Sequence, residues 1–115
     1  MEQALFAKTG EYKRLLAGAD TPGTAALFGL PPAGRAQMLA ALARDTGRPL
    51  CVVTPGEAEA TRFAADLNTL GIAAAVFPAR DLVLRPIEGT AREYEYRRLA
   101  VLGDLAGGRL QAVCL

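Results

Sequence analysis

The sequence predicts an α/β fold in which helices cover both sides of a mainly parallel β-sheet, giving three layers, α/β/α. Two observations predict this class. Short apolar runs of roughly four to six residues alternate along the chain with segments whose apolar residues recur at helical spacing. The apolar runs are nearly continuous rather than alternating with polar residues, as in parallel strands that are buried on both faces. The 115 residues suffice for one such domain or for part of one.

The chain is expected to begin with a helix that precedes the sheet. Residues 2–17 lie in a leading segment, 1–18, and place tyrosine and leucine side chains on one helical face. The remaining residues, 19–115, are expected to form the α/β domain, after a connector (ADTPGT) that is rich in turn-forming residues. The short apolar run AALF at 25–28 is expected to be the first strand.

Two helices and the strand between them are expected next. Helix 35–46 follows from spaced methionine and leucine residues, and Gly47 is a suitable end for it. The β-branched run at 50–53 is expected to be the second strand. Helix 57–70 has apolar residues at three- and four-residue spacing, and Thr54, which a proline follows, is expected to cap it.

The last part of the chain repeats the alternation. An apolar run predicts a third strand at 72–77, and a capping-box spacing predicts a helix from Thr90 to about residue 106. A last apolar run, 110–115, is expected to be a strand. Because the chain stops inside this run, the domain is expected to be truncated at its C-terminus, as a fragment of a larger protein.

The composition excludes several function classes. Without histidine the chain has no Ser-His-Asp arrangement, and its two cysteines cannot complete a zinc site, so no catalytic residue and no metal are expected. Cys51 and Cys114 lie in apolar runs and are expected to be buried, reduced thiols in strands. The net charge of +1 gives no general attraction to nucleic acid. No apolar run is long enough for a membrane span, and charged residues interrupt the N-terminus, so a cytoplasmic location is expected.

One segment resembles a phosphate-binding loop. Residues 29–36, GLPPAGRA, have the glycine spacing of the Walker A pattern G-x-x-x-x-G-K-[ST] in Gly29 and Gly34. Arg35 stands where the pattern has lysine, and Ala36 stands where it has the hydroxyl residue. The segment lies between an expected strand and an expected helix, which is the context that a phosphate loop requires.

The residues of this segment argue against a working nucleotide site. Pro31 and Pro32 have no N–H group to donate to a phosphate. The planar guanidinium of Arg35 does not replace a slender ammonium, and Ala36 cannot ligate magnesium. The segment is therefore expected to be a degenerate phosphate loop that binds no cofactor and serves as a strand-to-helix turn. Weak binding of an anion to the helix N-terminus stays open.

A second stretch, 80–98, is dense in charges of both signs and contains two tyrosines. Three interpretations stay open: a solvated helix face with ion pairs, a surface that contacts protein, and a grip on nucleic acid phosphates that the glutamates nearly cancel. The residues of the possible protein-contact face are Arg92, Tyr94, Tyr96, Arg97 and Arg98.

Residues 77–105, FPARDLVLRPIEGTAREYEYRRLAVLGDL, resemble the N-terminal region of bacterial transcription-repair coupling factors. In that family a Phe-Pro-Ala motif and an acidic, tyrosine-containing segment lead into a helix. The upstream order agrees, with a leading helix, a GL-x-x-x-x-R loop and a PL-x-VVTP strand before an acidic, alanine-rich helix. The likeness covers the chain from about residue 10 to 115 and rests on order and spacing rather than on one motif.

The resemblance implies a fold like the RecA-like first domain (1a) of UvrB, with a Walker A loop that is degenerate in the coupling factors. It implies that ATP and Mg²⁺ belong to a separate C-terminal DNA translocase of the full-length protein. Full-length members displace RNA polymerase stalled on double-stranded DNA and recruit UvrA for nucleotide excision repair. The UvrA contact is expected beyond Leu115, so this part would mainly contact its own neighbouring domains, with no membrane partner.

Three functions therefore compete. The first is a non-catalytic scaffold subdomain of a coupling factor. The alternative is a nucleotide-binding helicase or ATPase fragment, similar to UvrB, with a variant Walker A loop. The third is an unrelated α/β domain that binds a small ligand at the carboxyl ends of its strands.

Overall fold

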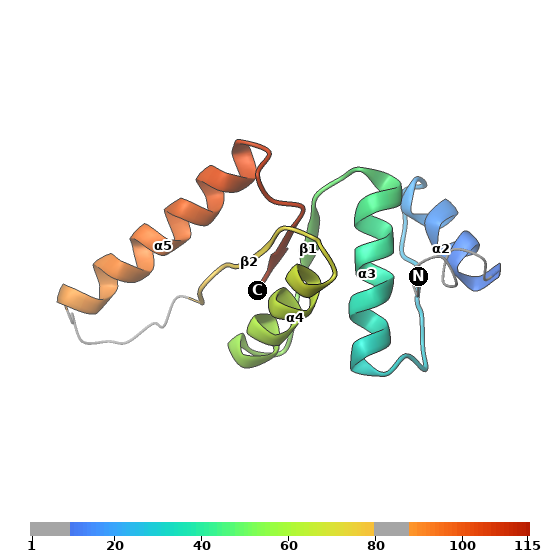
Figure 1. Ribbon diagram of the computed structural model, residues 1–115, viewed down its shortest axis with the longest axis horizontal. Helices are drawn as coiled ribbons and strands as arrows, with labels where there is room; N and C mark the ends of the chain where they lie inside the picture. Colours follow the sequence, from blue (N-terminus) through green and yellow to red (C-terminus); the bar gives the residue numbers. More distant parts are fainter. Residues whose placement is uncertain (1–9, 80–87) are drawn as a thin grey trace.

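The computed structural model describes residues 10–79 and 88–115, and it shows an α/β fold (Figure 1). The elements, in chain order, are α2 (Gly10–Ala19), α3 (Pro32–Thr46), β1 (Leu50–Val52), α4 (Glu57–Thr69), β2 (Ala74–Val76), α5 (Glu88–Ala106) and β3 (Ala112–Cys114). The helices and strands expected from residue 35 onward are confirmed, with ends that differ by a few residues. The leading helix is confirmed from Gly10, and its expected earlier part lies outside the described residues.

The sheet is parallel and has the order β1-β3-β2. The central strand β3 pairs with both neighbours in one register, so that Val113 lies between Cys51 of β1 and Ala75 of β2. Every connection between these strands contains a helix, as parallel pairing requires. The predicted parallel sheet is thus confirmed.

One face of this sheet carries the core, and helix α4 covers it (Figure 1). Side chains that alternate along the strands point to this face, and Ala112 and Cys114 of β3 are fully buried there. From α4, Ala60, Ala64 and Leu67 pack against them. The alanines let the helix approach the sheet closely, so the core consists mainly of small side chains around two large ones, Leu67 and Ile72.

Helices α3 and α2 extend this packed layer. Helix α3 adds Ala40 and Ala43 to the same core, and α2 packs on α3. The hydroxyl of Tyr12 in α2 donates a hydrogen bond to Asp45 at the end of α3.

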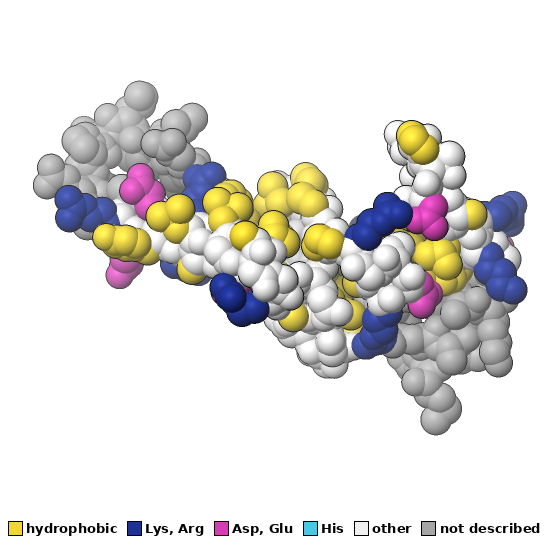
Figure 2. Space-filling view, turned by 90° about the horizontal axis from the view of Figure 1, so that it is seen from above, with side chains coloured by type: hydrophobic (Ala, Val, Ile, Leu, Met, Phe, Trp, Pro, Cys, Tyr) yellow, Lys and Arg dark blue, Asp and Glu magenta, His cyan; other side chains and the backbone are white. Residues whose placement is uncertain are grey.

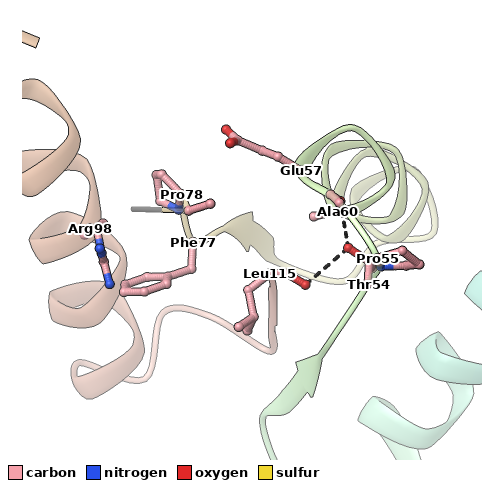
Figure 3. Close-up of a pocket in the computed structure, with 10 residues that line it drawn as sticks. Thr54, Pro55, Glu57, Ala60, Phe77, Pro78, Arg98 and Leu115 are labelled. Atoms are coloured by element: carbon pink, nitrogen blue, oxygen red, sulfur yellow. Dashed lines mark hydrogen bonds between the residues drawn. The ribbon is translucent and has the colours of Figure 1, made fainter. Parts of the chain in front are cut away.

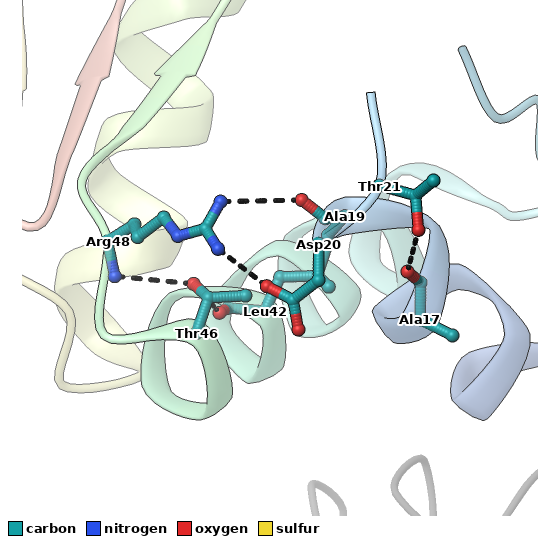
Figure 4. A network of polar contacts seen from close by, with 7 residues as sticks. All are labelled: Ala17, Ala19, Asp20, Thr21, Leu42, Thr46 and Arg48. Atoms are coloured by element: carbon teal, nitrogen blue, oxygen red, sulfur yellow. Dashed lines mark hydrogen bonds and ion pairs between the residues drawn. The ribbon is translucent and has the colours of Figure 1, made fainter. Parts of the chain in front are cut away.

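An ion pair holds the end of α2 close to β1. Arg48, which precedes β1, donates to the Asp20 carboxylate at 2.6 Å and to the carbonyl of Ala19 at 3.4 Å (Figure 4). The guanidinium thus lies at the C-terminal end of α2, where a cation is favourable. The chain after α2 therefore starts beside the amino end of β1.

The third layer is not formed by the described residues, which corrects the expected α/β/α arrangement. Helix α5 extends away from the sheet (Figure 1), and all its described side chains are exposed or half-buried. Hydrophobic side chains are visible along α5 and in the middle of the molecule in Figure 2. Consequently Cys51, whose side chain points to the uncovered face, is exposed, and only Cys114 is buried as predicted. Both are free thiols within strands.

The strand expected at 25–28 is also absent, so that prediction was wrong. Residues 24–31 have no regular structure, and Phe28 is 88% exposed. A short apolar run becomes a strand only when another strand pairs with it, and here it has no such partner.

Candidate functional site

A cavity of about 300 Å³ lies where the three strands end (Figure 3). The residues that follow β1, β2 and β3 form its floor and sides, with α4 and α5 on either side. The carboxyl edge of a parallel sheet is where α/β folds bind ligands, because loops and helix N-termini converge there. The lining residues are Thr54, Pro55, Gly56, Glu57, Ala60, Phe77, Pro78, Ala79, Arg98 and Leu115.

Main-chain bonds fix the β1 side of this cavity. The Thr54 amide donates to the carbonyl of Leu115 at 2.7 Å, which continues the sheet pairing beyond β1. The Thr54 hydroxyl lies 2.8 Å from the carbonyl of Gly56 and 3.2 Å from that of Leu115. These contacts turn the chain into α4, whose N-cap is Gly56 in an extended conformation. The prediction that Thr54 caps this helix was therefore wrong, since its hydroxyl donates to carbonyls instead.

The α5 side of the cavity carries a cation on an aromatic ring. The Arg98 guanidinium carbon lies 4.6 Å from the centre of the Phe77 ring (Figure 3). A guanidinium over a ring face is attracted by the negative face of the ring. Across the cavity, Glu57 supplies a carboxylate from the first turn of α4.

This lining can bind but offers no acid–base pair. Its ring, prolines and leucine provide apolar contact area, and Arg98 and Glu57 can each contact a polar group of a ligand. The Thr54 hydroxyl donates a hydrogen bond to the main-chain carbonyl of Gly56, so no base is positioned to activate it as a nucleophile.

The segment 29–36 lies elsewhere and does not form a phosphate cradle. Helix α3 begins at Pro32, so Gly34 and Arg35 belong to its first turn rather than to a loop after a strand. The Arg35 amide donates to the carbonyl of Pro31 at 3.0 Å, and its Nε donates to that of Leu30 at 3.1 Å. A main-chain N–H used within the helix is not available to a phosphate.

Gly29 lies before the helix with φ of 86°, and Ala36 and Gly34 have structural roles in α3. Ala36 is buried in the packed layer, at 1% exposure. A Cβ at Gly34 would lie 3.3 Å from the Pro31 ring, so the glycine permits the tight start of α3. None of these residues lines the cavity at the strand ends.

Helix α5 distributes the five residues of the possible protein-contact face over two sides. At 100° per residue, Tyr94, Arg97 and Arg98 share one side, whereas Arg92 and Tyr96 share another. Arg98 contacts Phe77 and lines the cavity, and the other four are exposed. The part of this stretch at 80–87 lies outside the described residues.

Sequence reasoning singled out Arg98 of the cavity as a possible protein contact, but it did not predict a cavity at the strand ends. Phe77 was noted only as part of the Phe-Pro-Ala motif, and Thr54, Glu57 and Leu115 carry no site motif. The signal that could have found them is their position directly after predicted parallel strands or at the start of the next helix. Within residues 10–79 and 88–115 no group of histidine, cysteine or carboxylate side chains could hold a metal ion. The described helices include none with the length and apolar character that a bilayer crossing needs.

Comparison with protein-family models, with curated proteins and with solved structures finds no match to this chain. The function is therefore inferred from the residues and the geometry alone.

Proposed function

We propose that this chain is a non-catalytic scaffold, the opening α/β subdomain of a transcription-repair coupling factor. One observation carries the non-catalytic part: the amide and guanidinium of Arg35 bond to the carbonyls of Pro31 and Leu30, where a phosphate loop would present free donors. The order of motifs from about residue 10 to 115 supports the family.

The proposal extends to the full-length protein. There a C-terminal motor would use ATP and Mg²⁺ to move along double-stranded DNA in the cytoplasm, displace stalled RNA polymerase and recruit UvrA. The UvrA contact would lie beyond Leu115. Neighbouring domains would cover the apolar side chains that α5 exposes, Leu99 and Leu102, and would complete a three-layer domain similar to UvrB domain 1a.

The size and partners of the native protein test the family proposal. An epitope tag inserted at the chromosomal start of the gene should mark a protein much larger than the 12.1 kDa of this chain. RNA polymerase should copurify with it after DNA damage. A tagged product of about 12 kDa, or a large product that never copurifies with polymerase, would contradict the proposal.

A titration with a fluorescent ATP analogue and Mg²⁺ tests the absence of nucleotide binding. We expect no saturable binding at micromolar concentration. The matched variant Arg35→Lys with Ala36→Thr restores the Walker A letters and should still not hydrolyse ATP, because Pro31 and Pro32 supply no N–H donors. Saturable binding by the native chain, or turnover by the variant, would favour the alternative of a UvrB-like ATPase fragment.

The cavity at the strand ends favours a second candidate, the binding of a small ligand. Its volume of about 300 Å³ is at the lower limit of ligand sites, and Arg98 and Glu57 give it two charged contacts. A fragment screen by NMR should then shift the amides of Gly56 and Phe77, and Arg98→Ala should abolish the shifts while Arg97→Ala keeps them. Shifts that survive Arg98→Ala would place the binding elsewhere.

A further inference from the structure

The outer edge of β2 carries main-chain groups that no described strand pairs. Strand β2 forms one end of the sheet, on the side of α5 (Figure 1). The Ala73 carbonyl and the Phe77 amide bond toward the neighbouring strand β3. Because successive residues of a strand direct their main-chain groups to opposite sides, the amides and carbonyls of Ala74 and Val76 point away from β3. Such groups are a template for a further strand.

Helix α4 supplies a partner for Ala74 at this edge. Near the end of the helix, the Asn68 side-chain NH₂ donates to the Ala74 carbonyl at 3.0 Å, and the Asn68 side-chain oxygen accepts from the Ala74 amide at 3.0 Å. The asparagine side chain offers a donor and an acceptor, as a peptide group does, so it occupies the place of a neighbouring strand. No hydrogen bond from a described residue reaches Val76 on this side. The outer edge is therefore closed at Ala74 and open at Val76.

Without Asn68, this edge could pair with a second copy of itself. Two β2 strands related by a twofold axis at Ala75 would run antiparallel, with Ala74 of each copy opposite Val76 of the other. Opposite residues of a hydrogen-bonded antiparallel pair exchange both of their main-chain bonds. Every bond in this arrangement would use the amide or the carbonyl of Ala74. Because Asn68 already occupies both groups, it blocks the whole arrangement.

The composition of β2 shows why its edge needs protection. Residues 72–77 read IAAAVF and contain neither a charge nor a proline, which are common protections of edge strands. Residues 73–77 are half-buried, so the edge is partly accessible. An apolar, uncharged run of this length tends to associate with its own kind when it is exposed. The side chain of Asn68 supplies the polar protection that the run itself lacks.

We propose that Asn68 closes the outer edge of β2 against a second copy of this chain, and that its removal lets two copies pair antiparallel through Ala74–Val76. The partner is a second copy because the edge is complementary to itself in this register and has no charge that would select an oppositely charged partner. The proposal does not depend on the proposed function.

Sedimentation equilibrium of three variants tests this role. The dimer dissociation constant of Asn68→Ala should lie at least about tenfold below that of the native chain. Gln111→Ala is the matched control, because the Gln111 side chain accepts from the Ala73 amide at 3.0 Å on the β3 side of β2. Its loss weakens the same end of β2 without opening the outer edge, so it should associate like the native chain. Asn68→Asp keeps an acceptor for the Ala74 amide and adds a charge, so it should not associate more strongly either.

Disulfide trapping tests the register of the dimer. In a background without the natural thiols, Cys51→Ser with Cys114→Ala, a single Ala75→Cys would face its counterpart at the axis, where Cα atoms lie about 4.5 Å apart. This distance is within disulfide range. We expect covalent dimers to form several-fold faster with Asn68→Ala than with Asn68 present. Ala74→Cys is the mismatched position, because its counterpart lies two residues further along and beyond about 7 Å.

Hydrogen exchange reports the closed edge without new cysteines. In dilute solution the Ala74 amide should exchange at least about tenfold faster in Asn68→Ala than in the native chain, and it should slow again as the protein concentration rises. Association of Asn68→Ala no stronger than that of Gln111→Ala would overturn the proposal. Covalent dimers as abundant at Ala74→Cys as at Ala75→Cys, or an Ala74 amide that exchanges equally fast with and without Asn68, would overturn it as well.

Discussion

Helices α4 and α5 have the same topological role but opposite environments. Each connects two parallel strands, α4 from β1 to β2 and α5 from β2 to β3. Helix α4 buries Ala60, Ala64 and Leu67 against the sheet. The longer α5 buries none of its described side chains, and its Leu99 is 63% exposed.

The topology explains why one sheet face is covered and the other is open. The chain crosses β3 outward through α4 and returns through α5, so two right-handed crossovers assign the helices to opposite faces. On the face assigned to α5, Val113 of the central strand is buried, whereas Cys51 and Val53 are exposed, Val53 at 76%. Apolar residues at helical spacing therefore indicate which side of a helix can be buried. The contrast of α4 with α5 shows that such spacing does not ensure burial.

The largest expected effect comes from truncating one leucine on each helix. Leu67→Ala should lower the free energy of unfolding by about 2–5 kcal/mol, because it leaves a cavity in a core in which only Leu67 and Ile72 are large. Leu102→Ala in α5 should change it by less than about 0.5 kcal/mol, because that side chain is exposed.

Urea unfolding followed by circular dichroism measures both changes. Equal losses of stability would show that α5 packs on the sheet in solution as tightly as α4. A cost below about 1 kcal/mol for Leu67→Ala would instead contradict the packed core around α4.

The reaction rates of the two cysteines report the accessibility of the two sheet faces. Cys51 should react with a thiol reagent at the rate of a solvent-exposed cysteine, whereas Cys114 should react only when the sheet opens locally. Burial also raises the pKa of the Cys114 thiol, with a smaller contribution from the nearby Cys51, so less of it is the reactive thiolate.

We expect a rate ratio of at least about 100-fold, equivalent to about 2.7 kcal/mol of opening free energy. The Cys51→Ser variant should lose the fast phase and keep the slow one. Two fast phases in the native chain would show that neither face is protected.

The sequence predicted the parts of this molecule that depend on local spacing. Helix α4 and the strands β1 and β3 follow from apolar periodicity and turn residues, so their positions could be predicted. Whether residues 25–28 pair with a strand depends on residues distant in the sequence. The exposure of Cys51 likewise depends on where α5 lies.

The candidate site was less predictable than the fold. Arg98 was noted among the charges of its helix, but its contact with Phe77 depends on how α5 meets the end of β2. Thr54 was expected to cap a helix, and only the proximity of Leu115 shows that its hydroxyl serves the end of the sheet. Residues that follow strands have no periodic pattern, so the sequence does not predict which of them meet in a site.

A smaller effect is expected where α2 joins the packed layer. Tyr12→Phe should cost about 1–2 kcal/mol, because it removes the hydrogen bond to Asp45. Burial, together with the hydrogen bond and charge of Asp45, raises the pKa of Tyr12 well above its ordinary value of 10. The unfolded chain therefore releases this proton first as the pH rises, and the stability that Tyr12 contributes is complete below about pH 10 and declines above it.

Urea unfolding of both proteins between about pH 8 and pH 11 measures this dependence. The difference between the native chain and Tyr12→Phe should be constant up to about pH 10 and then shrink. A difference that grows with pH would contradict the assigned environment of Tyr12.

The smallest expected effect concerns the contact of α5 with the end of β2. Arg98→Ala should lower the free energy of unfolding by about 0.5–1 kcal/mol, since its guanidinium lies on the Phe77 ring while the side chain stays half-exposed. Arg97→Ala, at the adjacent exposed position, is the matched control and should change little. A double-mutant cycle with Phe77→Leu isolates the pair, and a coupling energy above about 2 kcal/mol would contradict a weakly attached α5. With a coupling energy of that size, α5 would be held at the end of β2 by a strong local contact. The two helices would then differ in the extent of their contact with the sheet and not in the strength of their attachment.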